Sequence, residues 1–171
     1  TSFDSLCLIG FVFLKDNIRK ETVSAIRAIK SSGIQVVMVT GDSKQTAMAI
    51  ARETKILDGP TDIVLTSEEF NKMTDEYLMN ILPNLKVLSR ALPQDKNRLV
   101  KISQAKGLIV GMTGDGVNDA SALKKADVGF SLGSGTEVAK ETSDIVLLDD
   151  NIASITTAIL YGRTIFKSIR K

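Results

Sequence analysis

Histidine is absent from this chain of 171 residues, and cysteine occurs once, as Cys7. An internal disulfide is therefore excluded, as are the common zinc sites that combine cysteine with histidine. We expect a reducing, cytosolic environment for such a chain. Aromatic residues make up 5% of the sequence, and 22 basic against 20 acidic side chains leave a net charge of +2. Nucleic-acid binding uses a strongly basic, aromatic-rich surface, so we expect no nucleic-acid partner.

Long hydrophobic runs are missing as well. The apolar run from Leu6 to Leu14 is far shorter than the roughly 20 residues that cross a bilayer. It has neither the basic start nor the small-residue cleavage site of a signal peptide. We therefore expect this chain itself to be soluble, with no segment crossing a membrane as it stands.

Apolar runs alternate along the chain with segments of helical period, which is typical of an α/β fold with a mostly parallel sheet and helices on both faces. The chain shows no linker, repeat or low-complexity segment, so residues 1–150 are expected to form one domain and 151–171 a helical tail with a basic end. Strands are expected over residues 6–14, 34–40, 62–65, 87–90, 108–113, 128–132 and 144–148, of which 108–113 is the most strand-like. Helices are expected around 23–29 and 47–51 and over 67–82, 96–105, 118–126, 136–142 and 151–169.

The loop Thr113-Gly-Asp-Gly-Val-Asn-Asp119 follows the most strand-like run. Because ligands collect at the carboxyl ends of parallel strands, its polar side chains are candidates for a binding site. Asp115 and Asp119 can turn toward one point, and carboxylate oxygens on such a loop suit Mg²⁺. The structural alternative is a glycine turn with an Asn or Asp helix cap, which leaves Asp115 unexplained. A dinucleotide site would need a third glycine where the loop has Asp119.

Two further strand ends carry groups suited to phosphate. The Thr40 hydroxyl and the amides around Gly41 can bind a phosphoryl group at a helix N-terminus, although any capped helix after a strand shares this pattern. Lys96 stands at a predicted helix start, where the helix dipole disfavours a lysine unless an anion is near. An exposed lysine on a solvated helix is the alternative. Together the loops hold what phosphoryl transfer uses, but no activated serine, cysteine or histidine nucleophile is evident.

The stretch Thr113-Gly-Asp-Gly-Val-Asn-Asp-Ala-Ser-Ala-Leu-Lys-Lys-Ala-Asp127 resembles the hinge motif of P-type cation-transporting ATPases. The similarity continues through residues 133–151, Lys15-Asp-Asn-Ile-Arg19, Val39-Thr-Gly-Asp42 and Arg90-Ala-Leu-Pro-Gln-Asp-Lys96, and within the family it is greatest to calcium-type pumps. The resemblance implies a haloacid-dehalogenase-like Rossmannoid fold. Residues 1–150 would be the second sequence segment of the phosphorylation domain, and 151–171 a stalk helix leading toward a transmembrane helix.

The same resemblance implies Mg²⁺ and ATP as cofactors and assigns roles to individual residues. Asp115 would bind Mg²⁺ and Asp119 would support that site, while Lys96 and Asn118 contact the phosphoryl group. The residues near the ATP phosphates would be Thr40, Gly41 and Asp42, with Arg90 as a weaker nucleotide contact. The implied catalytic set is Thr40, Lys96, Asp115, Asn118 and Asp119.

Three positions depart from the family pattern. Asn17 and Ser121 stand where the family has proline, and Ser43 stands where asparagine is common. The loss of two prolines is expected to loosen those turns without removing a catalytic group. Asp16 and Arg19 match the family's Asp-Pro-x-Arg element, which is believed to order the domain around the nucleotide.

The family's Asp-Lys-Thr-Gly-Thr motif, whose aspartate takes the phosphate from ATP, does not occur in this sequence. Its strand is central in the family's sheet, so the sheet is expected to lack that strand and this chain alone to be inactive. ATP and the transported cation would be handled through the missing pump domains of an integral membrane protein. One alternative is a haloacid-dehalogenase-like phosphatase, whose Asp-x-Asp pair is not found after an apolar strand. The other is a non-catalytic interaction module.

Overall fold

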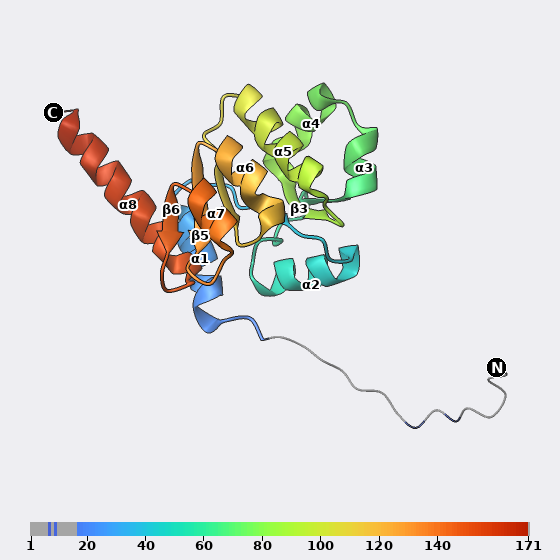
Figure 1. The fold of residues 1–171 in the computed structure, drawn as a ribbon. Helices are drawn as coiled ribbons and strands as arrows, with labels where there is room; N and C mark the ends of the chain where they lie inside the picture. The colour runs from blue at the N-terminus through green and yellow to red at the C-terminus, as the bar shows by residue number, and fades with distance from the viewer. Residues whose placement is uncertain (1–6, 8, 10–16, 171) are drawn as a thin grey trace.

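The computed structural model describes Cys7, Ile9 and residues 17–170. Apart from Cys7 and Ile9, the strand expected over residues 6–14 lies outside the described residues. Asp16, from the match to the family's Asp-Pro-x-Arg element, lies outside them as well. The elements follow one another in the order drawn in Figure 1. They are α1 (Lys20–Ser31), β1 (Met38–Val39), α2 (Lys44–Glu53), β2 (Ile63–Thr66), α3 (Ser67–Lys72), α4 (Asp75–Ile81), η1 (Leu82–Asn84), β3 (Leu85–Ser89), α5 (Pro93–Ala105), β4 (Gly111–Gly114), η2 (Val117–Asp119), α6 (Ala120–Lys125), β5 (Val128–Leu132), α7 (Glu137–Thr142), β6 (Ile145–Leu147) and α8 (Ile152–Ile169).

In the described part of the chain, the strands form two parallel sheets of three strands each, in the orders β1-β3-β2 and β4-β5-β6. The alternation of strands and helices therefore gives the parallel α/β architecture that the sequence predicts. Within the described residues, β1 and β4 each pair on one side only, at an edge of their sheets. The two sheets are consequently joined through helices and loops.

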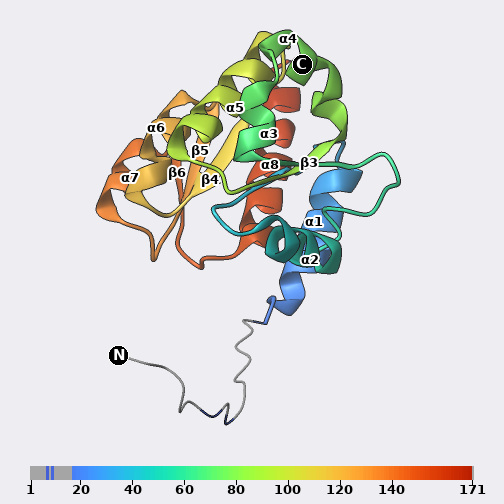
Figure 2. The ribbon, with the colours of Figure 1, turned by 90° about the vertical axis from the view of Figure 1, so that its right-hand side faces the viewer.

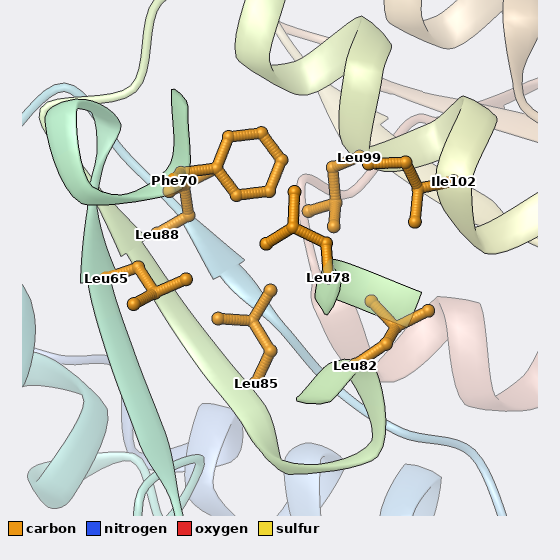
Figure 3. Close-up of a cluster of buried hydrophobic side chains, with 8 residues drawn as sticks. All are labelled: Leu65, Phe70, Leu78, Leu82, Leu85, Leu88, Leu99 and Ile102. Atoms are coloured by element: carbon orange, nitrogen blue, oxygen red, sulfur yellow. The ribbon is translucent and has the colours of Figure 1, made fainter. Parts of the chain in front are cut away.

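Helices cover both faces of the β1-β3-β2 sheet. On one face, α3, α4 and α5 contribute Phe70, Leu78, Leu99 and Ile102 to a cluster with leucines of β2 and β3, drawn in Figure 3. On the other face, Val87 of β3 meets Ile26 of α1 and two buried alanines of α2. Figure 2 shows α1 and α3 on different sides of this part of the fold.

The β4-β5-β6 sheet lies between α6 and α8. Phe130 of β5 packs with Leu147 of β6 and Ile155 of α8. Successive strand residues point to opposite faces, so the neighbouring Gly129 faces α6, where an added Cβ would lie 2.9 Å from the Leu123 carbonyl oxygen. Only glycine allows α6 to approach the strand this closely.

Local capping explains most helix ends. Ser43, which stands where asparagine is common in the family, accepts a hydrogen bond from the Thr46 amide and caps α2. Gly33 and Gly107 follow α1 and α5 with φ of 77° and 81°, the left-handed conformation expected of glycine C-caps. Glycine adopts this conformation without steric cost, so each helix can end at this point.

The prediction of one continuous helix over residues 67–82 is wrong in the middle of that range, because these residues form two helices, α3 and α4. Thr74 accepts a hydrogen bond from the Tyr77 amide and starts a new helix. Arg98 of α5 donates to the carbonyls of Phe70 and Met73, so a side chain from another element binds the carbonyls at the end of α3. A long-range contact thus overrides the helical period.

The strand expected over 108–113 starts later than predicted. The Leu108 amide donates to the Ser103 carbonyl at the end of α5, and Asp127 binds the Val110 amide through its carboxylate. These bonds occupy groups that a strand would use, and β4 begins only at Gly111. The long helix expected from residue 151 is confirmed as α8, and Figure 1 shows its end projecting from the body. No helix in the described part of the chain is long and apolar enough to cross a membrane.

Candidate functional site

The loops at the carboxyl ends of β1 and β3 are joined by backbone hydrogen bonds. Arg90, which follows β3, donates from its amide to the Asp42 carbonyl at 3.0 Å, and Ala91 donates to the Thr40 carbonyl at 2.9 Å. Thr40 also accepts a bond from the Asp42 amide on its hydroxyl. These bonds bring together Thr40, Gly41, Asp42 and Arg90 at the carboxyl ends of β1 and β3. In the sequence, Arg90 lies about fifty residues away from the other three.

A second group lies where α5 meets the loop after β4. Lys96 Nζ lies 2.5 Å from Asp119 Oδ1, and the two side chains are only 16% and 10% exposed. Lys96 sits in the first turn of α5 because Pro93 starts the helix. Lys96 is therefore not the exposed, solvated lysine of the alternative, and within the described protein its anionic partner is the Asp119 carboxylate. The phosphate contact expected for Lys96 stays a prediction.

Asp119 also organises the loop before it. Its second oxygen faces the amides of Asp115 and Gly116 at 3.4 Å each, which is long for a hydrogen bond. An added Cβ on Gly114 would lie 2.4 Å from the Asp119 Cβ, so only glycine leaves room for this carboxylate. Asp119 thus bridges Lys96 and the loop, whereas Asp115 and Asn118 are exposed.

The carboxylates of this loop can bind a hard cation only if a bound ligand supplies further oxygen atoms. Asp115 presents an exposed carboxylate, and Asp119 already shares one oxygen with Lys96. Among the described residues no cluster of three or more His, Cys, Asp or Glu side chains forms a ready-made metal site. Mg²⁺ commonly keeps waters and binds one or two carboxylates together with substrate phosphates, and Asp115 with Asp119 fits that pattern.

The sequence prediction missed the loop before α7. The Asp115 carbonyl accepts a bond from the Thr136 amide at 2.8 Å, and an added Cβ on Gly135 would lie 3.1 Å from that carbonyl oxygen. The segment Gly133-Ser-Gly-Thr136 therefore fixes the backbone of Asp115 from the other side. The two glycines of this segment are the sequence feature that could have indicated such a close approach.

Asp95, next to Lys96, was also missed as a structural group. It is 2% exposed and accepts bonds from the Ser67 hydroxyl, the Asn71 side-chain amide and the Leu92 amide at 2.6, 2.7 and 2.8 Å. Burial would raise the pKa of this carboxyl, but these donors, with the charge of Arg98, hold the pKa below its ordinary value. Asp95 joins α3 to the first turn of α5 and so fixes the helix that carries Lys96.

Ser121 and Arg19 both make contacts that reach another element. Ser121 donates to the side-chain oxygen of Asn97 at 3.1 Å and links α6 to α5 where the family has proline. Arg19 donates to the Asp150 carbonyl at 2.9 Å, which joins the start of α1 to the loop before α8. The expected loosening at position 121 is thus opposed by a hydrogen bond to α5.

Comparison with known proteins agrees with this arrangement. The family model described as haloacid dehalogenase-like hydrolase matches residues 3–127. Calcium-transporting ATPase 7, plasma membrane-type, of Oryza sativa subsp. japonica is 49% identical over 98% of this chain and 17% of its own length. Calcium-transporting ATPase lmo0841 of Listeria monocytogenes is 45% identical over 97% of this chain and 19% of its own. The chain thus spans less than one fifth of these relatives.

Solved structures of ATPases are also similar to this chain. A zinc-transporting PIB-type ATPase in the E2.Pi state superimposes with a TM-score of 0.70 and 29% identity over 91% of this chain and 21% of that one. The catalytic domain of the CPx-ATPase CopB-B gives a TM-score of 0.62 and 25% identity over 82% of this chain and 45% of that one. Both neighbours are ATPases that carry the same fold.

Proposed function

Because the chain belongs to the haloacid dehalogenase-like hydrolases and its relatives are calcium-transporting P-type ATPases, we propose that it is part of the phosphorylation domain of an ATP-driven calcium pump. Residues 1–150 are the second sequence segment of that domain, and residues 151–171 are the stalk helix leading to a membrane span. The domain lies on the cytosolic side of the membrane, and the other pump domains are its partners.

The observation that carries the proposal is the shielded Lys96–Asp119 pair beside the Asp115 loop. A lysine and two carboxylates at the carboxyl ends of β3 and β4 match the needs of aspartyl-phosphate formation. Asp115 is the Mg²⁺ ligand, with Asp119 supporting the same site. Mg²⁺ when bound neutralises charge on the phosphoryl group.

The remaining roles follow from position. Lys96 moves between Asp119 and a phosphoryl oxygen, and Asn118 donates to the same group from an exposed place on the loop. Thr40, Gly41, Asp42 and Arg90 bind the ATP phosphates, which reach this edge from the nucleotide-binding part of the protein. The nucleophilic aspartate comes from another segment, whose strand fits between the edge strands β1 and β4.

The first experiment incubates the chain alone with labelled ATP and Mg²⁺. The chain should retain no acid-stable, hydroxylamine-sensitive label, since its sequence lacks the Asp-Lys-Thr-Gly-Thr motif whose aspartate is the family's nucleophile. A longer chain that restores the Asp-Lys-Thr-Gly-Thr motif should retain label. Stoichiometric labelling of the short chain would contradict the proposal, and release of phosphate by it would favour the phosphatase alternative.

Variants of the longer chain separate the residue roles. Asp115→Asn should abolish labelling more completely than Asp119→Asn, because the former removes a metal ligand. Lys96→Ala should lower the labelling rate by about 100-fold, the loss expected when one charged donor leaves a phosphoryl group. Lys101→Ala, on the exposed face of the same helix, is the matched control and should match the parent. Equal labelling in all four variants would refute the assignment.

A further inference from the structure

Helix α3 carries none of the residues to which a role in phosphoryl transfer has been given, yet it lies against the helix that carries Lys96. It begins directly after β2, which pairs in parallel with β3, and α5 follows β3 after a short loop. The two helices therefore start at the same edge of the sheet. Phe70 of α3 and Leu99 of α5 belong to one buried cluster, drawn in Figure 3. Polar side chains of α3 can thus reach the first turn of α5.

Two side chains of α3 donate to the buried carboxylate that precedes Lys96 in the chain. Asn71 donates from Nδ2 to Asp95 Oδ1 at 2.7 Å, and Ser67 donates from its hydroxyl to Asp95 Oδ2 at 2.6 Å. The second oxygen also accepts the Leu92 amide. Both oxygens of the carboxylate are therefore bound, and rotation of the Asp95 side chain would break a bond that water cannot replace in this buried place.

Asn71 is held in one orientation by a second residue of α5. Its side-chain oxygen accepts a bond from Arg98 Nη1 at 3.3 Å, while its nitrogen donates to Asp95. A half-turn of the amide would place its oxygen against the carboxylate and its nitrogen against the guanidinium, so both bonds would be lost. Asn71 consequently contacts the residue before Lys96 and the residue two positions after it.

Helix α3 is itself held in place by its neighbours. Phe70 is fully buried in the apolar cluster beneath the helix. Thr66 and Glu69 bind each other's amides in a capping box at the start of the helix. Glu69 also pairs with Lys44, the first residue of α2, whose Nζ lies 3.0 Å from both carboxylate oxygens. A helix this short is marginal by itself, so these contacts give Asn71 its fixed position.

The bonds to Asp95 also determine where Lys96 points. Successive residues lie about 100° apart around an α-helix, so Lys96 leaves α5 on a different side from Asp95. With Asp95 held against α3, Lys96 is directed toward the loop after β4, where its Nζ lies 2.5 Å from Asp119 Oδ1. A small rotation of this first turn would displace the end of the long lysine side chain. A displacement of about 1 Å at a reacting group can cost about 100-fold in rate.

We propose that Asn71, together with Ser67, is a positioning residue for Lys96. Asn71 holds Asp95, and Asp95 fixes the direction in which α5 presents the ammonium group. This inference rests on the proposed function, because it concerns the lysine that acts on the phosphoryl group. It adds to that function a helix whose side chains act on the reaction through Lys96 alone.

Labelling of the longer chain with ATP and Mg²⁺ tests the proposal. Asn71→Ala should lower the labelling rate at saturating ATP about 10-fold, because the remaining donors still hold Asp95 in part. The ATP concentration that gives half the maximal rate should not change, since the contacts of Asn71 outside its own helix go to α5 and not to the loop at Thr40.

A double variant shows whether Asn71 acts through the lysine. In a chain that already carries Lys96→Ala, Asn71→Ala should lower the remaining rate by less than about 2-fold, since the side chain that it positions is gone. A further loss of about 10-fold in that background would mean that Asn71 acts by another route, and it would overturn the proposal.

Two control variants separate positioning from stability. Leu78→Val removes a methylene group from the same buried cluster, so it should lower the melting temperature and leave the labelling rate near that of the parent. Glu68→Ala, which breaks an exposed pair on α3, should match the parent in both measurements. If Asn71→Ala labels as fast as Leu78→Val, Asn71 has no positioning role and the proposal is wrong.

Nuclear magnetic resonance spectra of the 171-residue chain test the same placement without any activity. Asn71→Ala should shift the amide resonances of Lys96 and Asp119, whereas Leu78→Val should leave both nearly unchanged. If the parent of the longer chain takes no label, the proposed function fails, and these spectra alone then decide whether Asn71 places Lys96. Unchanged Lys96 and Asp119 resonances in Asn71→Ala would overturn the inference in either case.

Discussion

Asp95 and Asp119 show how neighbouring groups stabilise a buried carboxylate. Asp95 has three hydrogen-bond donors and little exposure, and Asp119 has a lysine and two distant amides. Removal of either carboxylate leaves its donors unpaired in a place that water reaches poorly. The resulting loss of folding free energy exceeds the net contribution of the hydrogen bond itself. The two residues flank Lys96, so its position depends on both.

Replacement of Asp95 by alanine should destabilise the chain by roughly 2–4 kcal/mol at pH 7, because donors from Ser67, Asn71 and Leu92 lose their acceptor. The pKa of Asp95 is lowered in the folded chain, so its contribution is fully present above its unfolded pKa of about 4 and is lost as the pH falls through the folded value. The difference between wild type and variant, measured by urea unfolding, should therefore shrink below about pH 4.

The control for this prediction is Glu68→Ala, which removes a carboxylate from an exposed pair with Lys72 on α3. Its unfolding midpoint should stay close to that of the wild type. An Asp95→Ala variant as stable as the Glu68→Ala variant would contradict the structural role given to Asp95.

Gly114→Ala should destabilise the chain by about 1–3 kcal/mol and displace Asp119, since the new methyl would overlap the Asp119 side chain. Gly116→Ala is the matched control in the same loop, because its nearest contact would be 3.9 Å away. Thermal unfolding measures the loss, and the amide chemical shift of Asp119 reports the displacement. Unchanged shifts in the Gly114 variant would show that the loop adapts without moving the carboxylate.

Helix α8 has two halves with different surroundings. Its first half packs through Ile152, Ile155 and Ile159 against β5, β6 and α1. From Leu160 onward every described residue is exposed, and Arg163 makes the last recorded contact with the body. Helix stability comes mainly from packing of an apolar face, so the halves should differ in stability.

Hydrogen exchange should accordingly be fast for amides after Gly162 and slow across β3, whose central residues Val87 and Leu88 are fully buried and paired on both sides. The run 108–113, expected from its sequence to be the core strand, should exchange faster than β3 because β4 pairs on one side in the described chain. Protection of the last α8 turns equal to that of β3 would favour an ordinary packed terminal helix over a stalk.

At the scale of the whole molecule, the described residues form two small parallel sheets, and contacts between helices join the two halves. Ile152, at the start of α8, packs both against the cluster of Ile26 and Val87 and against that of Phe130 and Leu147. It therefore connects the cores of the two sheets. The α1–α8 contact and the Lys96–Asp119 pair are further links between the same two halves.

Ile152→Ala should cost about 1–3 kcal/mol, and it should lower the protection of β5 amides more than that of β3 amides. The reason is that β3 keeps the larger cluster with α3, α4 and α5. Ile165→Ala, an exposed position on the same helix, is the control and should leave both unchanged. Equal losses in β3 and β5 would mean that the two sheets unfold as one unit.

Features that depend on neighbours in the chain were predictable from sequence. The period of α8, the cap at Ser43 and the glycine stops at Gly33 and Gly107 all arise from groups within a few residues of one another. The same holds for the candidate loops at Thr40 and Asp115, because each follows its own strand. The family motifs identified the fold, and the family match supports it. Metal and nucleotide roles at these loops stay predictions.

Only the tertiary structure shows which distant groups meet. The pairing of Lys96 with Asp119 spans 23 residues, and the bonds from Ser67 and Asn71 to Asp95 span 28 and 24. The break between α3 and α4 depends on Arg98, and the late start of β4 depends on Asp127. A period or a motif records what each segment can form by itself. Side chains that arrive from other elements then compete for the same backbone groups, and the stronger set of bonds decides where a strand begins, where a helix ends and which carboxylate is buried.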